Sequence, residues 1–252
     1  MLTPMDRVSP ADGSLPSPNE TAPDVSALVE DARARAKRVA EEVVNALTHG
    51  LGLLAIAALS PFLIAAAPAG APRVSAIVYC ASMTLLFGAS TLYHAVEETD
   101  FAQRHAGRWS SRLQTFDHIA IYLFIAGSYT PFVMVTLQGS RWQWPTMVTV
   151  WSIAAAGVVF KVLGGTRLRG VGVFSYLGLG WIALVILPEL AQRLMRLDLA
   201  LLTVGGLLYT GGVYFFWRDH RRYHHAIWHV FVLSAAGCHL VAIAHVLQSA
   251  PG

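Results

Sequence analysis

The feature that most limits how this chain can fold is a succession of seven apolar stretches, each long enough to cross a lipid bilayer. A transmembrane helix needs about 20 mostly apolar residues. The continuous apolar character of these stretches favours helices over membrane-barrel strands, in which apolar and polar residues alternate. The sequence therefore predicts an all-α membrane protein, a seven-transmembrane helix bundle. The predicted spans are residues 44–67, 74–94, 113–137, 144–163, 171–190, 199–216 and 226–247.

Composition excludes the main alternative classes. Only 13% of the 252 residues are charged, against about 25% in soluble domains, so too little charge is present to cover a soluble globule. The apolar share of 55% excludes a disordered chain. We expect one membrane domain, residues 41–252, preceded by a disordered cytoplasmic tail, residues 1–40. Residues 25–39 are expected to form either a short amphipathic helix on the membrane surface or a solvated helical leader to the first span.

The positions of Lys and Arg predict the orientation of the bundle. Of the 18 Lys and Arg residues, 14 fall in the N-terminal tail and in the loops on its side of the membrane. The four exceptions are Arg73, Arg141, Arg193 and Arg196. Because cytoplasmic loops are enriched in Lys and Arg, the N-terminus is predicted to be cytoplasmic and the C-terminus outside. Membrane orientation accounts for the positive charge, so no nucleic-acid partner is expected.

Six ionisable residues within or at the ends of the predicted spans form the candidate functional site. Ionisable side chains inside membrane spans are costly and usually functional. With the predicted orientation, all six lie in one thin layer near the cytoplasmic face. Because the orientation was derived from Lys and Arg alone, this shared depth is independent support for a common site. The six are His49, His94, Asp117, His118, His225 and His229.

Three of the histidines have the spacing of a metal site. His225 and His229 are four residues apart and share one face of a helix. His94, on the second span, is the expected third ligand. Three histidines with an open fourth position are the arrangement of catalytic zinc. Other first-row metals also accept this donor set, but zinc is the expected ion.

Two further residues are expected to serve catalysis at this site. Asp117 could orient a histidine or hold a water molecule, and Ser90 lies one helical turn from His94 on the same face. A polar stripe on the first span, consisting of Glu42, Asn45 and His49, is expected to face the bundle.

The remaining polar and proline positions receive structural interpretations. His118 points about 100° away from Asp117 and is expected either to support the site behind the ligands or to be structural. His239 lies about 15 Å beyond His229 along the helix and is excluded from the metal site. Pro131 is expected to bend the third span and Pro188 to end the fifth.

The sequence resembles the hemolysin III family, the bacterial branch of the progestin and adipoQ receptor group. The matching segments are EEVVNALTHG, STLYH, TFDHIAIYLFIAGSYTP and HHAIWHVFVLSAAGCH, which lie in order between about residues 41 and 247. The resemblance implies a seven-helix bundle with zinc near the cytoplasmic face. The family histidines fall on His94, His225 and His229, the aspartate on Asp117 and the serine on Ser90.

The resemblance leaves three functions open. Related receptors are regarded as ceramidase-type lipid amide hydrolases, which implies a zinc-dependent hydrolase acting on a membrane lipid in the plasma membrane. The family name, by contrast, derives from a pore-forming, cell-lysing activity. A membrane receptor or sensor stabilised by zinc is the third alternative.

Overall fold

The computed structural model describes residues 25–99, 108–164 and 169–250. Seven of its helical segments are long and apolar enough to cross a membrane, which confirms the predicted seven-helix bundle. Two spans are composite, since α4 continues into η1 and α6 into α7. The elements are α1 (Val25–Ala66), α2 (Ala71–Glu97), α4 (Arg108–Pro131), the π-helix η1 (Phe132–Thr136), α5 (Gln143–Gly164), α6 (Arg169–Trp181), α7 (Ala183–Arg193), α8 (Arg196–Trp217) and α9 (His224–Gln248).

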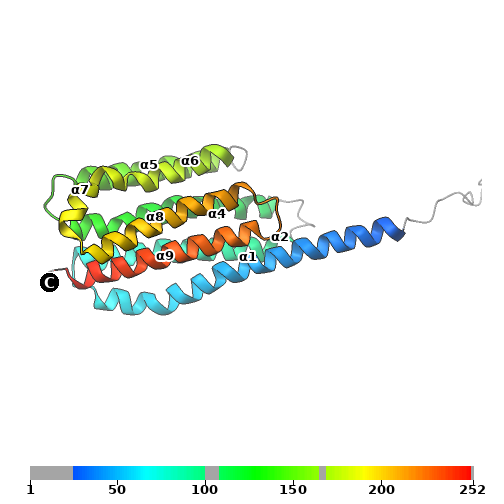
Figure 1. The fold of residues 1–252 in the computed structure, drawn as a ribbon, viewed down its shortest axis with the longest axis horizontal. Helices are drawn as coiled ribbons and strands as arrows, with labels where there is room; N and C mark the ends of the chain where they lie inside the picture. Colours follow the sequence, from blue (N-terminus) through cyan, green and yellow to red (C-terminus); the bar gives the residue numbers. More distant parts are fainter. Residues whose placement is uncertain (1–24, 100–107, 165–168, 251–252) are drawn as a thin grey trace, which may run out of the picture. The chain divides into compact units, whose positions relative to one another are not determined.

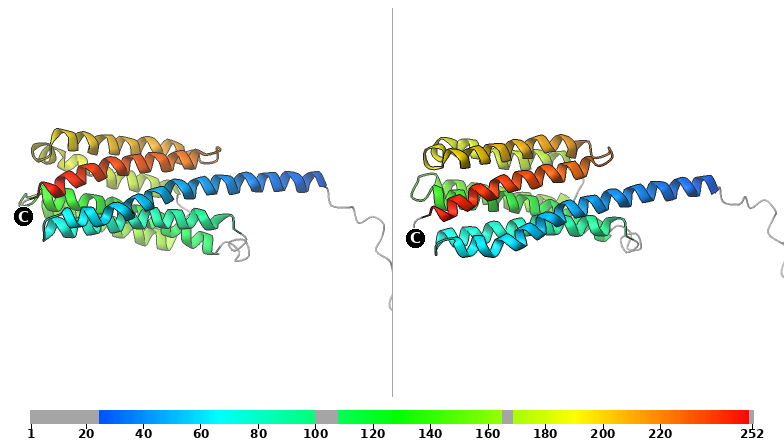
Figure 2. Two further views of the ribbon diagram at one scale, coloured as in Figure 1. Left: turned by 90° about the horizontal axis from the view of Figure 1, so that it is seen from below. Right: turned by 60° about the horizontal axis from the view of Figure 1, so that its bottom comes forward.

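The chain divides into two compact units, residues 1–37 and residues 38–252. In the first unit, residues 1–24 lie outside the described residues, so the predicted disorder of the tail falls there. Residues 25–39 are helical and belong to α1, the same helix that forms the first span. The second unit contains the bundle, in which α1 and α9 finish at the same end, as an odd number of alternating spans requires (Figure 1; Figure 2).

The central element of the bundle is α4, which packs against α2, α5, α6 and α9. In an 18-residue apolar window of the span made by α4 and η1, 67% of the residues are buried, compared with 17% in the corresponding window of α8. Small residues allow this close approach. A Cβ atom placed on Gly157 of α5 would lie 2.3 Å from the ring of Tyr122 on α4. Helices α8 and α9 lie side by side along their length (Figure 1).

The fifth span is interrupted between Trp181 and Ala183, where α6 ends and α7 begins. A tyrosine from α4 satisfies the backbone at this break. The Tyr129 hydroxyl donates to the carbonyl oxygens of Leu179, at 3.1 Å, and Gly180, at 2.5 Å. The same hydroxyl accepts from the Ala183 amide at 2.7 Å.

The prediction that Pro188 ends the fifth span is wrong. Pro188 lies inside α7, which continues to Arg193. Proline is tolerated in membrane helices where other groups satisfy the freed backbone. At Pro131, by contrast, the helix does change, since the α-helical hydrogen bonding of α4 gives way to the π-helix η1.

Candidate metal centre

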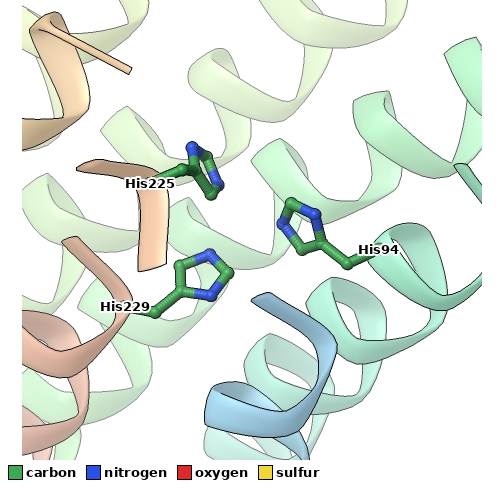
Figure 3. A group of neighbouring side chains, drawn as sticks. All are labelled: His94, His225 and His229. Atoms are coloured by element: carbon green, nitrogen blue, oxygen red, sulfur yellow. The ribbon is translucent and has the colours of Figure 1, made fainter. Parts of the chain in front are cut away.

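Three imidazole rings converge between two helices. His225 and His229 lie on α9 one turn apart, and His94 faces them from α2 (Figure 3). One nitrogen from each ring can be chosen so that all three lie within 4.8 Å of one another. The ring centroids of His94 and His229 are 4.9 Å apart, and those of His225 and His229 are 4.6 Å apart. Such a group could hold one metal ion, and the structure brings together the three residues that the sequence predicted as ligands.

Helix α1 fixes the orientation of the His94 ring. Its Nδ1 lies 2.6 Å from Oε2 of Glu42, so Nδ1–H donates to the carboxylate. The other nitrogen, Nε2, is buried and has no hydrogen-bond partner among the described residues. A ring held in this tautomer presents an unprotonated Nε2, which is the form that binds a metal.

The same helix fixes His229. Its Nδ1 lies 3.1 Å from the carbonyl oxygen of Asn45 and 3.1 Å from Oγ1 of Thr48. The Thr48 hydroxyl donates its own proton to the Asn45 carbonyl at 2.8 Å. Both oxygens can therefore accept from His229 Nδ1–H, which again leaves Nε2 unprotonated. This donor set fits a metal of the zinc class, because neutral imidazoles with a hydrogen-bonded Nδ1 are typical of such sites.

The two predicted catalytic residues lie beside the histidines. The side chain of Asp117 is close enough to interact with His94 and to accept a hydrogen bond from Ser90. Ser90 Oγ also lies 2.7 Å from Nδ1 of His49, whose ring stacks on His229 with centroids 3.6 Å apart. His49 thus connects the serine to the metal centre through direct contacts.

The metal centre forms part of the wall of a cavity of about 630 Å³ inside the bundle. Near the histidines its lining includes Glu42, Ser90 and Asp117. Away from the histidines, the lining of the cavity is mostly apolar and includes Phe132 and Leu190. Phe132 follows Asp117 by 15 residues, so the cavity extends over about 20 Å at about 1.5 Å per helical residue. This length and apolar lining suit a hydrocarbon chain.

Sequence reasoning placed Glu42 and Asn45 on a stripe facing the bundle but gave them no role at the metal. Thr48 was not singled out. The spacing of the polar stripe was the only sequence signal that these residues face the histidines, because residues three and four apart share a helix face. Their partners are distant in sequence, and no local pattern identifies them.

The protein-family model described as "Haemolysin-III related" matches residues 37–240, a range that contains every residue of the site. The chain belongs to the haemolysin-III family. This family member is 37% identical over 201 residues to "Hemolysin-3" of Bacillus cereus, covering 79% of this chain and 88% of the relative. It is 38% identical over 201 residues to the "Hemolysin-3 homolog" of Bacillus subtilis, covering 79% and 90%.

The haemolysin-III similarity extends to mammals. The human "Monocyte to macrophage differentiation factor" is 31% identical over 183 residues, which cover 71% of this chain and 73% of the relative. The matches to bacterial and mammalian proteins confirm the family resemblance inferred from the four sequence segments.

Proposed function

We propose that this protein is a zinc-dependent hydrolase that cleaves a lipid amide within the membrane. The observation that carries the proposal is the position of the three histidines on the wall of a long, mostly apolar cavity. Three histidines that could hold one metal ion support hydrolysis, and the cavity supports a lipid as substrate. A zinc ion held by these histidines would polarise the substrate carbonyl and activate water near neutral pH.

The protein residues then have separate roles. Asp117 lies beside His94 and would accept the proton of the attacking water. Ser90 would donate a hydrogen bond to the oxygen on which negative charge develops. Since the His49 ring can donate Nδ1–H to Ser90 Oγ at 2.7 Å, Ser90 keeps its own proton as a donor, and the hydroxyl would rotate from Asp117 to that oxygen as the charge develops.

The test is a hydrolysis assay on purified protein loaded with one equivalent of zinc. The substrates are ceramides and other N-acyl lipids in mixed micelles, and fatty-acid release is measured by mass spectrometry. We expect release by the unaltered protein and at least a hundredfold loss in Asp117→Asn, since positioned proton transfer contributes about 10²–10⁴-fold. Absence of cleavage across the panel, with zinc content verified, would overturn the proposal.

A pore is the second candidate function, favoured by the name "Hemolysin-3" of two relatives. It predicts dye release from liposomes that is unchanged in His229→Ala, because a pore does not require the metal centre. Dye retention by liposomes containing the folded protein would exclude it.

We also infer that the N-terminus is cytoplasmic and that the protein resides in the plasma membrane. The Lys and Arg distribution supports the orientation. Single cysteines can be introduced at Ser140 and at His220, which lie in turns at opposite ends of the bundle. We expect an impermeant thiol reagent to label the Ser140 position, and not the His220 position, in intact cells.

A further inference from the structure

A second polar cluster lies deep in the bundle, away from the metal centre. It consists of Tyr79 on α2, Tyr209 on α8 and His239 on α9, and we call it the mid-cavity site. The rings of Tyr209 and His239 have centroids 5.5 Å apart. Tyr79 is 0% exposed, and the rings of Tyr79 and Tyr209 both pack against Phe124, with centroid distances of 6.3 Å and 6.5 Å. None of these residues belongs to the proposed catalytic machinery.

The two tyrosine hydroxyls lack protein partners. Both oxygens are buried, and neither has a hydrogen-bond partner among the described residues. Buried polar groups in proteins are nearly always hydrogen-bonded, and the lipid interior offers no partner to compensate. These two hydroxyls therefore point to a polar ligand.

His239 adds an acceptor to the tyrosine donors. Its Nε2 lies 3.3 Å from the Leu202 carbonyl oxygen, so Nε2–H donates to the backbone and Nδ1 is left as an acceptor. The ring fits against α8 only because residue 205 is glycine, since a Cβ there would lie 2.4 Å from Cδ2 of His239. The orientation of the ring is therefore built into the helix contact.

The mid-cavity site lies on the same cavity as the metal centre, because Tyr209 and His239 both line it together with His229. His239 follows His229 by ten residues on one helix, which corresponds to about 15 Å. A single extended lipid chain with its reacting group at the histidines would pass this point about midway along an acyl chain.

We propose that the mid-cavity site binds a hydroxyl group carried on the acyl chain of the lipid. A hydroxyl both accepts and donates, so it can accept from Tyr209 and donate to Nδ1 of His239. Water is the competing occupant, and the experiment below distinguishes the two. The proposal rests on the proposed function for the identity of the ligand as a lipid, but its test measures binding and requires no hydrolysis.

The test is equilibrium binding of fatty acids to the purified, zinc-loaded protein in nanodiscs, by competition with a fluorescent fatty acid. The probes are stearate and a series of hydroxystearates that carry the hydroxyl on different carbons. We expect the mid-chain hydroxystearates to bind about five- to tenfold more tightly than stearate, the effect of one or two additional hydrogen bonds. Hydroxyls near either end of the chain should give no preference.

The decisive variant is Tyr209→Phe, which removes the hydroxyl and keeps the ring. We expect it to abolish the preference for the mid-chain hydroxyl while stearate affinity and zinc content stay unchanged. The matched control is Tyr214→Phe, because Tyr214 is on the same helix but 51% exposed and absent from the cavity lining.

Two outcomes would overturn the proposal. Equal binding of all the fatty acids by the unaltered protein would assign the tyrosine hydroxyls to water. A preference that persists in the folded Tyr209→Phe variant would place the hydroxyl-binding group elsewhere. Absence of lipid hydrolysis together with an intact hydroxyl preference would reject the proposed function and leave the mid-cavity site standing.

Discussion

Nδ1 of His94 on α2 lies 2.6 Å from Oε2 of Glu42 on α1, which links the first span to the candidate metal centre. His229 has an equivalent link through the Asn45 carbonyl, one turn farther along α1. Although α1 supplies none of the three histidines, it fixes the protonated nitrogen of two of them. We therefore assign α1 the role of orienting two of the three candidate ligands.

The first prediction concerns Glu42. Glu42→Ala is expected to weaken zinc affinity about 10- to 100-fold, the usual cost of removing the partner of a ligating histidine. Glu42→Gln should have a smaller effect, because the amide oxygen still accepts from Nδ1–H. Zinc affinity is measured by competition with a chromogenic chelator. The matched control is the neighbouring Glu41→Ala, which removes a pair with Arg222 at 3.7 Å; equal losses in both variants would refute the positioning role.

The second prediction concerns the histidines. Wild-type protein purified without chelator should contain about one zinc per chain by elemental analysis, and His94→Ala and His229→Ala should contain almost none. His220→Ala, in an exposed turn, is the control and should retain the metal. Full zinc content in either folded ligand variant would show that the metal lies elsewhere.

A third prediction tests the packing of α4 against α5. Gly157→Ala should lower the unfolding free energy by about 1–3 kcal/mol, the typical cost of overpacking. The new methyl group would lie 2.3 Å from the Tyr122 ring, which is only 1% exposed and cannot move aside. Gly178→Ala is the control, because no atom lies within 4 Å of its Cβ position. Thermal unfolding in detergent should separate the two variants, and similar midpoints would contradict this packing.

A fourth prediction concerns a polar pair far from the metal centre. His245 Nδ1 on α9 lies 2.7 Å from Oδ1 of Asp198 on α8, and Asp198 is 2% exposed. Asp198→Asn should destabilise the protein by about 1–3 kcal/mol, because a partly buried hydrogen bond to a charged group is weakened. Zinc content should not change. Glu189→Gln, which removes an exposed pair with Arg193, should cost less than about 1 kcal/mol; an equal cost would show that the Asp198 pair is no stronger than a surface pair.

The sequence alone determined the seven spans and the depth of the histidines within them. Both follow from local properties, since a run of about 20 apolar residues is sufficient to identify a span. Depth follows from the distance of a residue to the end of its span. The pairing of His225 with His229 was also predictable, because residues four apart share a helix face.

Only the tertiary structure decided which residues support the metal site and where the cavity runs. The partners Asn45 and His229 are 184 residues apart, and their contact depends on how α1 and α9 are rotated and packed. The fifth span breaks just before Ala183 and not at Pro188, where the sequence predicted its end. This break is stabilised by Tyr129 from another helix. Hydropathy specifies that a segment enters the membrane, but side-chain packing between helices sets which face each residue presents to its neighbours.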